Sequence, residues 1–107
     1  MSHPPAEHVL DALGNQTRRD ILHLLRQNVL TVGAIAEHFP ISRPAISKHL
    51  RILQEAGLVG YNTDGTRNVF HLKPIGFRDA RVYLDLFWDE ALTNFKRVAE
   101  DSSELNE

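Results

Sequence analysis

The spacing of apolar residues along the chain changes from helical to alternating and back to helical. Apolar residues recur every three or four positions in four stretches of the first half, which is typical of short amphipathic helices. These predicted helices cover 6–13, a segment from Asn15 or Thr17 to about 27–28, 31–39 and 42–54. Helical spacing returns at Pro74 and continues to about Ala99, which predicts one long final helix.

Between the fourth and the final helix the pattern predicts a small β-hairpin. Two short runs, 58–63 and 66–72, surround the pair Asp64-Gly65. This pair favours a two-residue type I′ turn, which needs positive φ at both central positions. The chain is therefore predicted to be mainly α with one hairpin, in the order α-α-α-α-β-β-α.

The third and fourth predicted helices form a pair joined by a tight turn. Thr31 and Ser42 are residues that commonly cap a helix N-terminus, because their side-chain oxygen accepts a bond from a backbone N–H in the first turn. Pro40 cannot continue the first helix of the pair, whereas Pro44 is tolerated in the first turn of the second. This arrangement is typical of a helix-turn-helix.

Charge along the second helix of this pair differs from that of the whole chain. The 107-residue sequence has a formal net charge of −2, yet Ile41 to Gln54 carries three Lys or Arg side chains, one His and no acid. Residues 43–81 hold seven bases against three acids, and residues 85–107 hold seven acids against two bases. Because a carboxylate would repel phosphates, we predict that the 42–54 helix faces DNA.

Three segments together resemble the ArsR-type winged-helix repressors of prokaryotes. They are Ala12–Leu22, Ala34–Ala36 and Ser42–Leu50, and the resemblance covers about Val9 to Phe95. It implies a homodimeric winged helix-turn-helix repressor that binds double-stranded DNA at an operator. It also implies that the hairpin is the wing, and that a metal ion or another inducer often releases the DNA.

Each candidate DNA contact has an expected role. We expect Arg43, Ser47 and Lys48 to read base edges, while His49, Arg51 and the wing residue Arg67 hold phosphates. Arg67 could equally be a solvated surface residue. The full predicted set is Thr31, Ser42, Arg43, Pro44, Ser47, Lys48, His49, Arg51, Thr66 and Arg67.

The final helix is too long for the small core that this chain can form. It therefore needs a second surface, most simply the same helix of a second copy in a two-fold dimer, with the first helix joining the interface. The alternative is a helix that lies wholly on its own domain. The predicted interface residues are Val9, Leu10, Leu13, Leu84, Phe87, Trp88, Ala91 and Phe95.

Candidate metal and catalytic chemistry is weak. The sequence has no Cys, so it has neither a disulfide nor a thiolate metal site. The resemblance implies a thiolate site on the third helix and a site containing His on the last, but 32–36 offers no donor and 74–99 contains no His. We therefore predict no metal and no cofactor, and leave any small-molecule inducer unknown. No phosphate loop or catalytic triad motif appears, so the chain is not expected to be an enzyme.

The same patterns predict the domain limits. We expect a disordered N-terminus at 1–5, one winged helix-turn-helix domain at 6–99 and an acidic tail at 100–107. No apolar run exceeds three residues and no secretory signal is present, so no membrane contact is expected and the chain is predicted to be cytoplasmic. A winged-helix module that binds another protein and not DNA is the competing interpretation.

Overall fold

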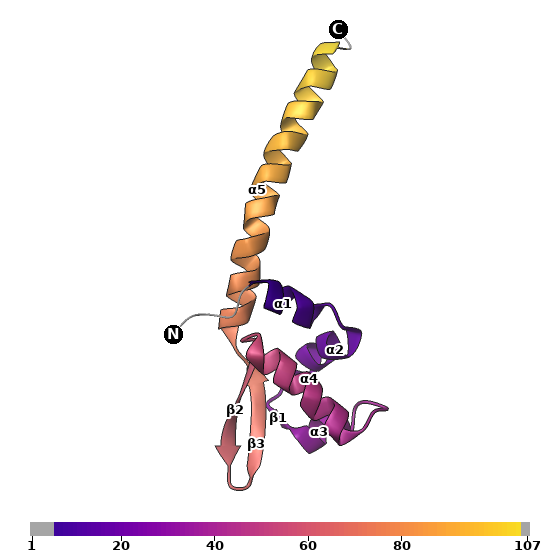
Figure 1. Cartoon of the computed structure of the whole chain (residues 1–107), viewed down its shortest axis with the longest axis vertical. Coiled ribbons are helices and arrows are strands. Elements are labelled where there is room, and N and C mark those ends of the chain that lie inside the picture. The colour runs from indigo at the N-terminus through magenta and orange to yellow at the C-terminus, as the bar shows by residue number, and fades with distance from the viewer. Residues whose placement is uncertain (1–5, 106–107) are drawn as a thin grey trace.

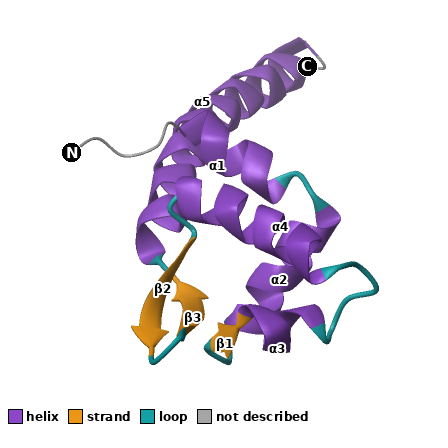
Figure 2. Ribbon diagram, turned by 60° about the horizontal axis from the view of Figure 1, so that its bottom comes forward, coloured by secondary structure: helices purple, strands orange, loops and turns teal. Residues whose placement is uncertain are grey.

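The computed structural model describes residues 6–105, and it confirms a mainly α fold with a small antiparallel sheet (Figures 1 and 2). Predicted features at 1–5 and 106–107 lie outside the described residues. The elements in chain order are α1 (Ala6–Leu13), α2 (Gln16–Leu25), β1 (Leu30–Thr31), α3 (Val32–Ala36), α4 (Arg43–Glu55), β2 (Val59–Asp64), β3 (Arg67–Leu72) and α5 (Pro74–Leu105). We call residues 6–72 the head.

The sheet contains a strand that the pattern did not predict. β1 pairs antiparallel with β3, with Leu30 opposite Phe70, so the three strands lie in the order β1-β3-β2. A strand of two residues is too short to show alternation, and only its partner reveals it. The extra strand ties the middle of β3 to the residues directly before α3.

The turn of the hairpin also differs from the prediction. Asp64 pairs with Arg67 across the strands, so the connecting residues are Gly65 and Thr66. Gly65 has φ +64, and no non-glycine residue in the described part of the chain has positive φ. The predicted type I′ turn at Asp64-Gly65 is therefore wrong. Positive φ at the first central residue alone is typical of a type II′ turn, which suits Gly at that position.

Side-chain caps fix the starts of three helices. The Asn15 side chain accepts from the backbone N–H of Arg18 at 3.0 Å, so the cap of α2 is Asn15 and not Thr17. The hydroxyls of Thr31 and Ser42 cap α3 and α4, as predicted. The ends were predicted less well: α2 stops at Leu25 and α3 at Ala36, each a few residues early.

The core lies mainly inside the head, where each of the four helices and the sheet contribute buried apolar residues, and Ala80 of α5 adds to it. The buried side chains are Val9, Ala12, Ile21, Leu22, Leu25, Ile35, Ile46, Leu50, Leu53, Ala56, Leu58, Val59, Phe70 and Ala80. Val9 has no exposed surface in the single chain. Its predicted place in a dimer interface is therefore wrong, because a second copy could not contact its side chain.

Beyond its first turns α5 projects away from the head (Figure 1). The radius of gyration is 19.3 Å, whereas a compact chain of this length has about 13 Å. The helix continues to Leu105, so the predicted end near Ala99 is wrong, and most of the predicted tail is helical. No Gly or Pro occurs after Gly76, so nothing in the backbone chemistry ends the helix sooner.

A backbone crossing joins α5 to the end of α4. Gly57 follows α4 with φ +75, and its carbonyl accepts from the backbone N–H of Gly76 at 2.9 Å. A Cβ on Gly76 would lie 2.6 Å from the carbonyl oxygen of Ala56 and 2.8 Å from the carbonyl carbon of Gly57. Both glycines are therefore required for the two helices to meet this closely.

Candidate nucleic-acid interface

The solvent-facing side of α4 presents a row of polar and cationic side chains. The α4 face, as we call it, consists of Arg43, Pro44, Ser47, Lys48 and Arg51, which line one shallow hollow and are all exposed. These residues share a side because positions four apart lie on one side of a helix. No Asp or Glu lines this hollow. The face is positively charged, as the predicted phosphate contact requires.

The opposite side of α4 explains why this face is held outward. Ile46, Leu50 and Leu53 are buried in the core. Ser42 starts the helix, its Oγ accepting from the backbone N–H of Ala45 at 3.2 Å. The buried stripe fixes the rotation of the helix about its axis, so the α4 face points into solvent.

A second hollow connects α4 to the hairpin. The wing hollow is lined by Thr31, Val32, Arg43, Thr66, Arg67 and Asn68, again without an acid. It therefore brings together four of the predicted DNA-binding residues from three separate parts of the chain. The sheet achieves this, because β1 holds Thr31 beside β3, which begins at Arg67 (Figure 2). The hairpin tip and α3 lie at the end of the head opposite α5 (Figure 1).

Arg43 belongs to both hollows and links them. An ideal Cβ built on Gly33 would lie 3.6–3.7 Å from three atoms of the Arg43 guanidinium, so this group rests on the backbone of α3. A glycine at this point leaves room for the guanidinium to lie across the helix. The charge of Arg43 is thus held between the α4 face and the tip of the hairpin.

The hydroxyl groups of Thr31 and Ser42, which cap α3 and α4, can still donate a hydrogen bond. Thr31 Oγ1 accepts from the N–H of Ala34 at 3.2 Å, and Ser42 uses its oxygen in the same way. A hydroxyl that accepts one bond still has its own O–H to donate. Both residues can therefore cap a helix and also donate a hydrogen bond to a phosphate.

His49 lies apart from the α4 face. It is half-buried, and its Nδ1 is 3.5 Å from a guanidinium nitrogen of Arg18 on α2. Burial lowers the pKa of His49 below its ordinary value of about 6.5, and the charges of Arg18 and Lys48 lower it further. The lowered pKa favours the neutral imidazole at pH 7, in which one ring N–H can still donate to a phosphate.

Two residues of the wing hollow were absent from the predicted set. Val32 begins α3, and Asn68 lies opposite Thr63 in the hairpin. Thr63 Oγ1 donates to Asn68 Oδ1 at 3.4 Å, which leaves the amide NH₂ of Asn68 able to donate elsewhere. In the observed register Arg67 and Asn68 form the first two cross-strand pairs after the turn, whereas the predicted register, one residue early, places them one position further from it.

The predicted interface residues other than Val9 fall into two groups. Leu10 and Leu13 of α1 are half-buried. The five residues on α5, which are Leu84, Phe87, Trp88, Ala91 and Phe95, are all exposed in the single chain. Their surface is available for a second copy, and their place in an interface stays a prediction.

Within residues 6–105, which the structure describes, no three His, Asp or Glu side chains are grouped in a way that could hold a metal ion. Among the described helices, none combines the length and apolar character needed to cross a membrane.

Sequence comparison decides the family. The family model described as "Bacterial regulatory protein, arsR family" matches residues 15–61, which include α2 to α4 and the start of β2. The HTH-type transcriptional regulator Rv2034 of Mycobacterium tuberculosis is 41% identical over 93 residues, covering 87% of this chain and 87% of that protein. The chain belongs to the ArsR family. It is therefore a transcriptional regulator and not an enzyme.

Two further proteins extend this similarity. The transcriptional repressor SdpR of Bacillus subtilis is 40% identical over 72 residues, covering 67% of this chain and 80% of that protein. A solution structure from Mycobacterium bovis, described as a homodimeric winged helix-turn-helix DNA-binding domain, is 32% identical with a TM-score of 0.61, covering 82% of each chain. The predicted winged helix-turn-helix fold and ArsR resemblance are thus confirmed.

Proposed function

We propose that this ArsR-family regulator is a sequence-specific repressor that binds an imperfect palindromic operator as a homodimer, without responding to a metal ion. The observation that carries the proposal is the acid-free surface that the α4 face and the wing hollow share through Arg43. A duplex presents phosphates on both sides of each groove, so a recognition helix and a wing of like charge match it.

The geometry supports separate roles for the residues of this surface. Arg43, Ser47 and Lys48 lie toward the N-terminal half of α4, the part of a recognition helix that contacts base edges. Arg51 lies one turn further on, and Arg67 and Asn68 lie on the wing. These three, with the hydroxyls of Thr31 and Ser42, would hold phosphates and set the position of α4 without reading sequence.

A homodimer is supported by α5. Its exposed apolar side chains have no core to pack against within one chain, and a two-fold partner would bury them. In such a dimer the two α4 helices would enter successive major grooves about 34–36 Å apart, which requires a palindromic operator. The similar Mycobacterium bovis protein is described as homodimeric.

Independence from metal ions is supported by the sequence. The ArsR resemblance implies thiolate ligands in the segment that is α3 here, and α3 reads Val-Gly-Ala-Ile-Ala, which has no side-chain donor. The sequence contains no Cys elsewhere. We therefore expect zinc, cadmium or arsenite to leave operator affinity unchanged.

The experiment measures DNA affinity by fluorescence anisotropy. The probes are a duplex from the region upstream of the protein's own gene and a scrambled duplex of equal composition, each at several salt concentrations. Arg43→Ala should weaken binding to the upstream duplex by about thirtyfold or more and leave the scrambled duplex almost unchanged, because an arginine–guanine contact is worth about 1–3 kcal/mol and the homodimer loses two of them. Arg51→Ala should weaken both alike and reduce the log–log salt slope by about 1.8, because a homodimer loses two phosphate contacts at about 0.9 each.

Lys96→Ala is the matched control, because it removes an exposed cation from α5, far from the proposed surface. Equal losses on both duplexes for Arg43→Ala would refute its role in base reading. Equal affinity of the unmodified protein for both duplexes at every salt concentration would refute sequence-specific binding. No measurable binding to either duplex would favour the competing winged-helix module that binds only protein.

A further inference from the structure

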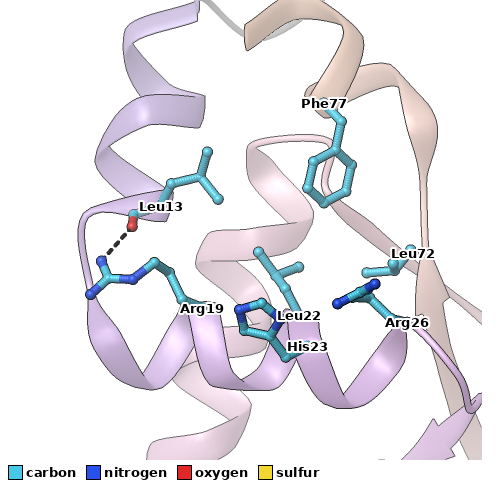
Figure 3. Close-up of a pocket in the computed structure, with 7 residues that line it drawn as sticks. All are labelled: Leu13, Arg19, Leu22, His23, Arg26, Leu72 and Phe77. Atoms are coloured by element: carbon cyan, nitrogen blue, oxygen red, sulfur yellow. Dashed lines mark hydrogen bonds between the residues drawn. The ribbon is translucent and has the colours of Figure 1, made fainter. Parts of the chain in front are cut away.

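A hollow of about 400 Å³ lies away from the proposed DNA surface, where the end of α1, helix α2, the end of β3 and the start of α5 meet (Figure 3). We call it the α2–α5 hollow. It is lined by Leu13, Arg19, Leu22, His23, Arg26, Leu72 and Phe77. None of these residues lines the α4 face or the wing hollow. The hollow is therefore a separate feature that DNA binding does not explain.

The interior of this hollow is apolar. Leu22 lies at its base, and the Phe77 ring borders the opening with 36% of its surface exposed. Leu13 and Leu72, both half-buried, complete the apolar lining. A volume near 400 Å³ falls within the range of small-molecule sites, about 300–1,000 Å³, and an apolar lining with a few polar groups is typical of them.

The rim is cationic, and no Asp or Glu lines the hollow. The two terminal guanidinium nitrogens of Arg19 donate to the carbonyl of Leu13 at 2.8 Å and to Gln16 Oε1 at 2.9 Å. Both acceptors are neutral, so the charge of Arg19 is not cancelled. Arg26 is exposed, and its guanidinium points into the space bordered by Leu22, Leu72 and Phe77 (Figure 3). Arg26 can therefore offer two parallel N–H donors to a carboxylate.

We propose that the α2–α5 hollow binds a small carboxylate with an aromatic body. The apolar interior takes the ring system, Arg26 binds the carboxylate, and Arg19 adds a positive potential at the same opening. A neutral molecule of equal shape would fill the interior but leave the arginines without a counter-charge, so the site selects for the anion.

The test is calorimetric titration of the purified full chain at pH 7.5 with 2-naphthylacetate, and with 2-naphthylacetamide as its neutral counterpart. Because no DNA is present, the result does not depend on the proposed operator binding. We expect saturable binding of one acid per chain and at least tenfold weaker binding of the amide. Arg26→Gln should weaken the acid about tenfold and leave the amide unchanged, whereas Phe77→Ala should weaken both.

Lys96→Gln is the charge control and should bind both compounds like the unmodified protein. Circular dichroism checks that each variant is folded. If Arg26→Gln is not folded, Phe77→Ala provides the test, because its arginines are intact and it should still bind the acid at least tenfold more tightly than the amide. Equal affinity for acid and amide overturns the proposal. So does the lack of saturable binding, which is also the result expected if a second copy of the chain covers the opening.

Discussion

The head buries many of its large apolar side chains, whereas the outer part of α5 leaves its own exposed. In the head, large apolar residues such as Ile46 and Leu50 have at most 1% of their surface exposed. On α5, Trp88 is 63% exposed and Phe95 is 71% exposed, although the same helix begins with a buried Ala80. The head thus forms a complete core from one chain. The outer part of α5 carries apolar surface that a single chain cannot bury.

This difference separates two sources of stability. Burial of one large apolar side chain contributes about 1.5–3 kcal/mol, so the head gains this within one protomer, whereas α5 can gain it only by association. The acid-free surface for DNA lies wholly on the head. Mutations in the two regions should therefore have distinguishable effects on folding, association and DNA binding.

The largest effect is expected from charges on the apolar surface of α5. Trp88→Glu with Phe95→Glu should convert the dimer to a monomer, as measured by sedimentation velocity, because burying carboxylates without partners is unfavourable. Operator affinity should then fall by about 10²–10⁴, since the second half-site no longer adds to binding. Thr93→Glu with Arg97→Glu, on the other side of the helix, is the control and should remain dimeric. A double Trp88/Phe95 variant that still sediments as a dimer would show that this surface is not the interface.

A core residue of the head should behave differently. Leu50→Ala should lower the free energy of unfolding by about 3 kcal/mol, because it leaves a cavity under α4. The loss, measured by urea denaturation, should be the same at every protein concentration. Leu84→Ala on α5 should show a loss that depends on concentration, because it acts through association. Leu50→Met serves as the volume-conserving control. If the losses of unfolding free energy for Leu50→Ala and Leu84→Ala depend on protein concentration in the same way, the proposed difference between the head and α5 is refuted.

The cap of α4 should have a smaller effect. Ser42→Ala removes the acceptor for the N–H of Ala45 and should lower the unfolding free energy by about 1 kcal/mol. It also removes a proposed phosphate donor, so affinity for the upstream and the scrambled duplex should fall together. Ser42→Thr keeps both functions and is the control. A variant in which stability falls but affinity for both duplexes is unchanged would exclude the phosphate contact.

The smallest effect concerns pH and also belongs to the head. Because burial and the charges of Arg18 and Lys48 lower the pKa of His49, the unfolded chain binds a proton there more readily than the folded one. The contribution of His49 to stability is therefore complete above about pH 6.5 and is lost as the pH falls toward the lowered value. NMR titration should show that Arg18→Met moves this pKa upward. An unchanged pKa in that variant would rule out Arg18 as a cause.

Local signals allowed much of the head to be predicted from the sequence. Thr31 and Ser42 are caps because their own side chains reach N–H groups three residues away, an interaction that needs no distant partner. The outward position of Arg43 and Arg51 follows from the buried stripe on α4, which the helical spacing already indicated. For these residues, local chemistry and the final fold agree.

The wrong predictions concern features that depend on residues distant in the sequence, or for which the sequence pattern fits two structures equally well. β1 exists only because Leu30 pairs with Phe70, forty positions later, and two residues carry no pattern of their own. The turn shifted by one residue because Gly65 suits either register of a two-residue loop. Val9 fits the apolar pattern of an exposed interface helix as well as that of a core helix, and only the packing of α1 inside the head distinguishes them.

The close backbone contact between Gly57 and Gly76 holds α4, the proposed recognition helix, rigidly against α5, the proposed dimerisation helix. The Cα of Gly76 lies directly against the backbone of Ala56 and Gly57, and the Gly76 N–H donates to the Gly57 carbonyl, so this contact has no side chain of its own that could adjust its rotamer. In a pair joined along α5, the distance between the two recognition helices is consequently set at this corner. In the proposed dimer, a methyl group added at Gly76 would alter the preferred spacing between operator half-sites, while every proposed DNA-binding residue kept its place within the head.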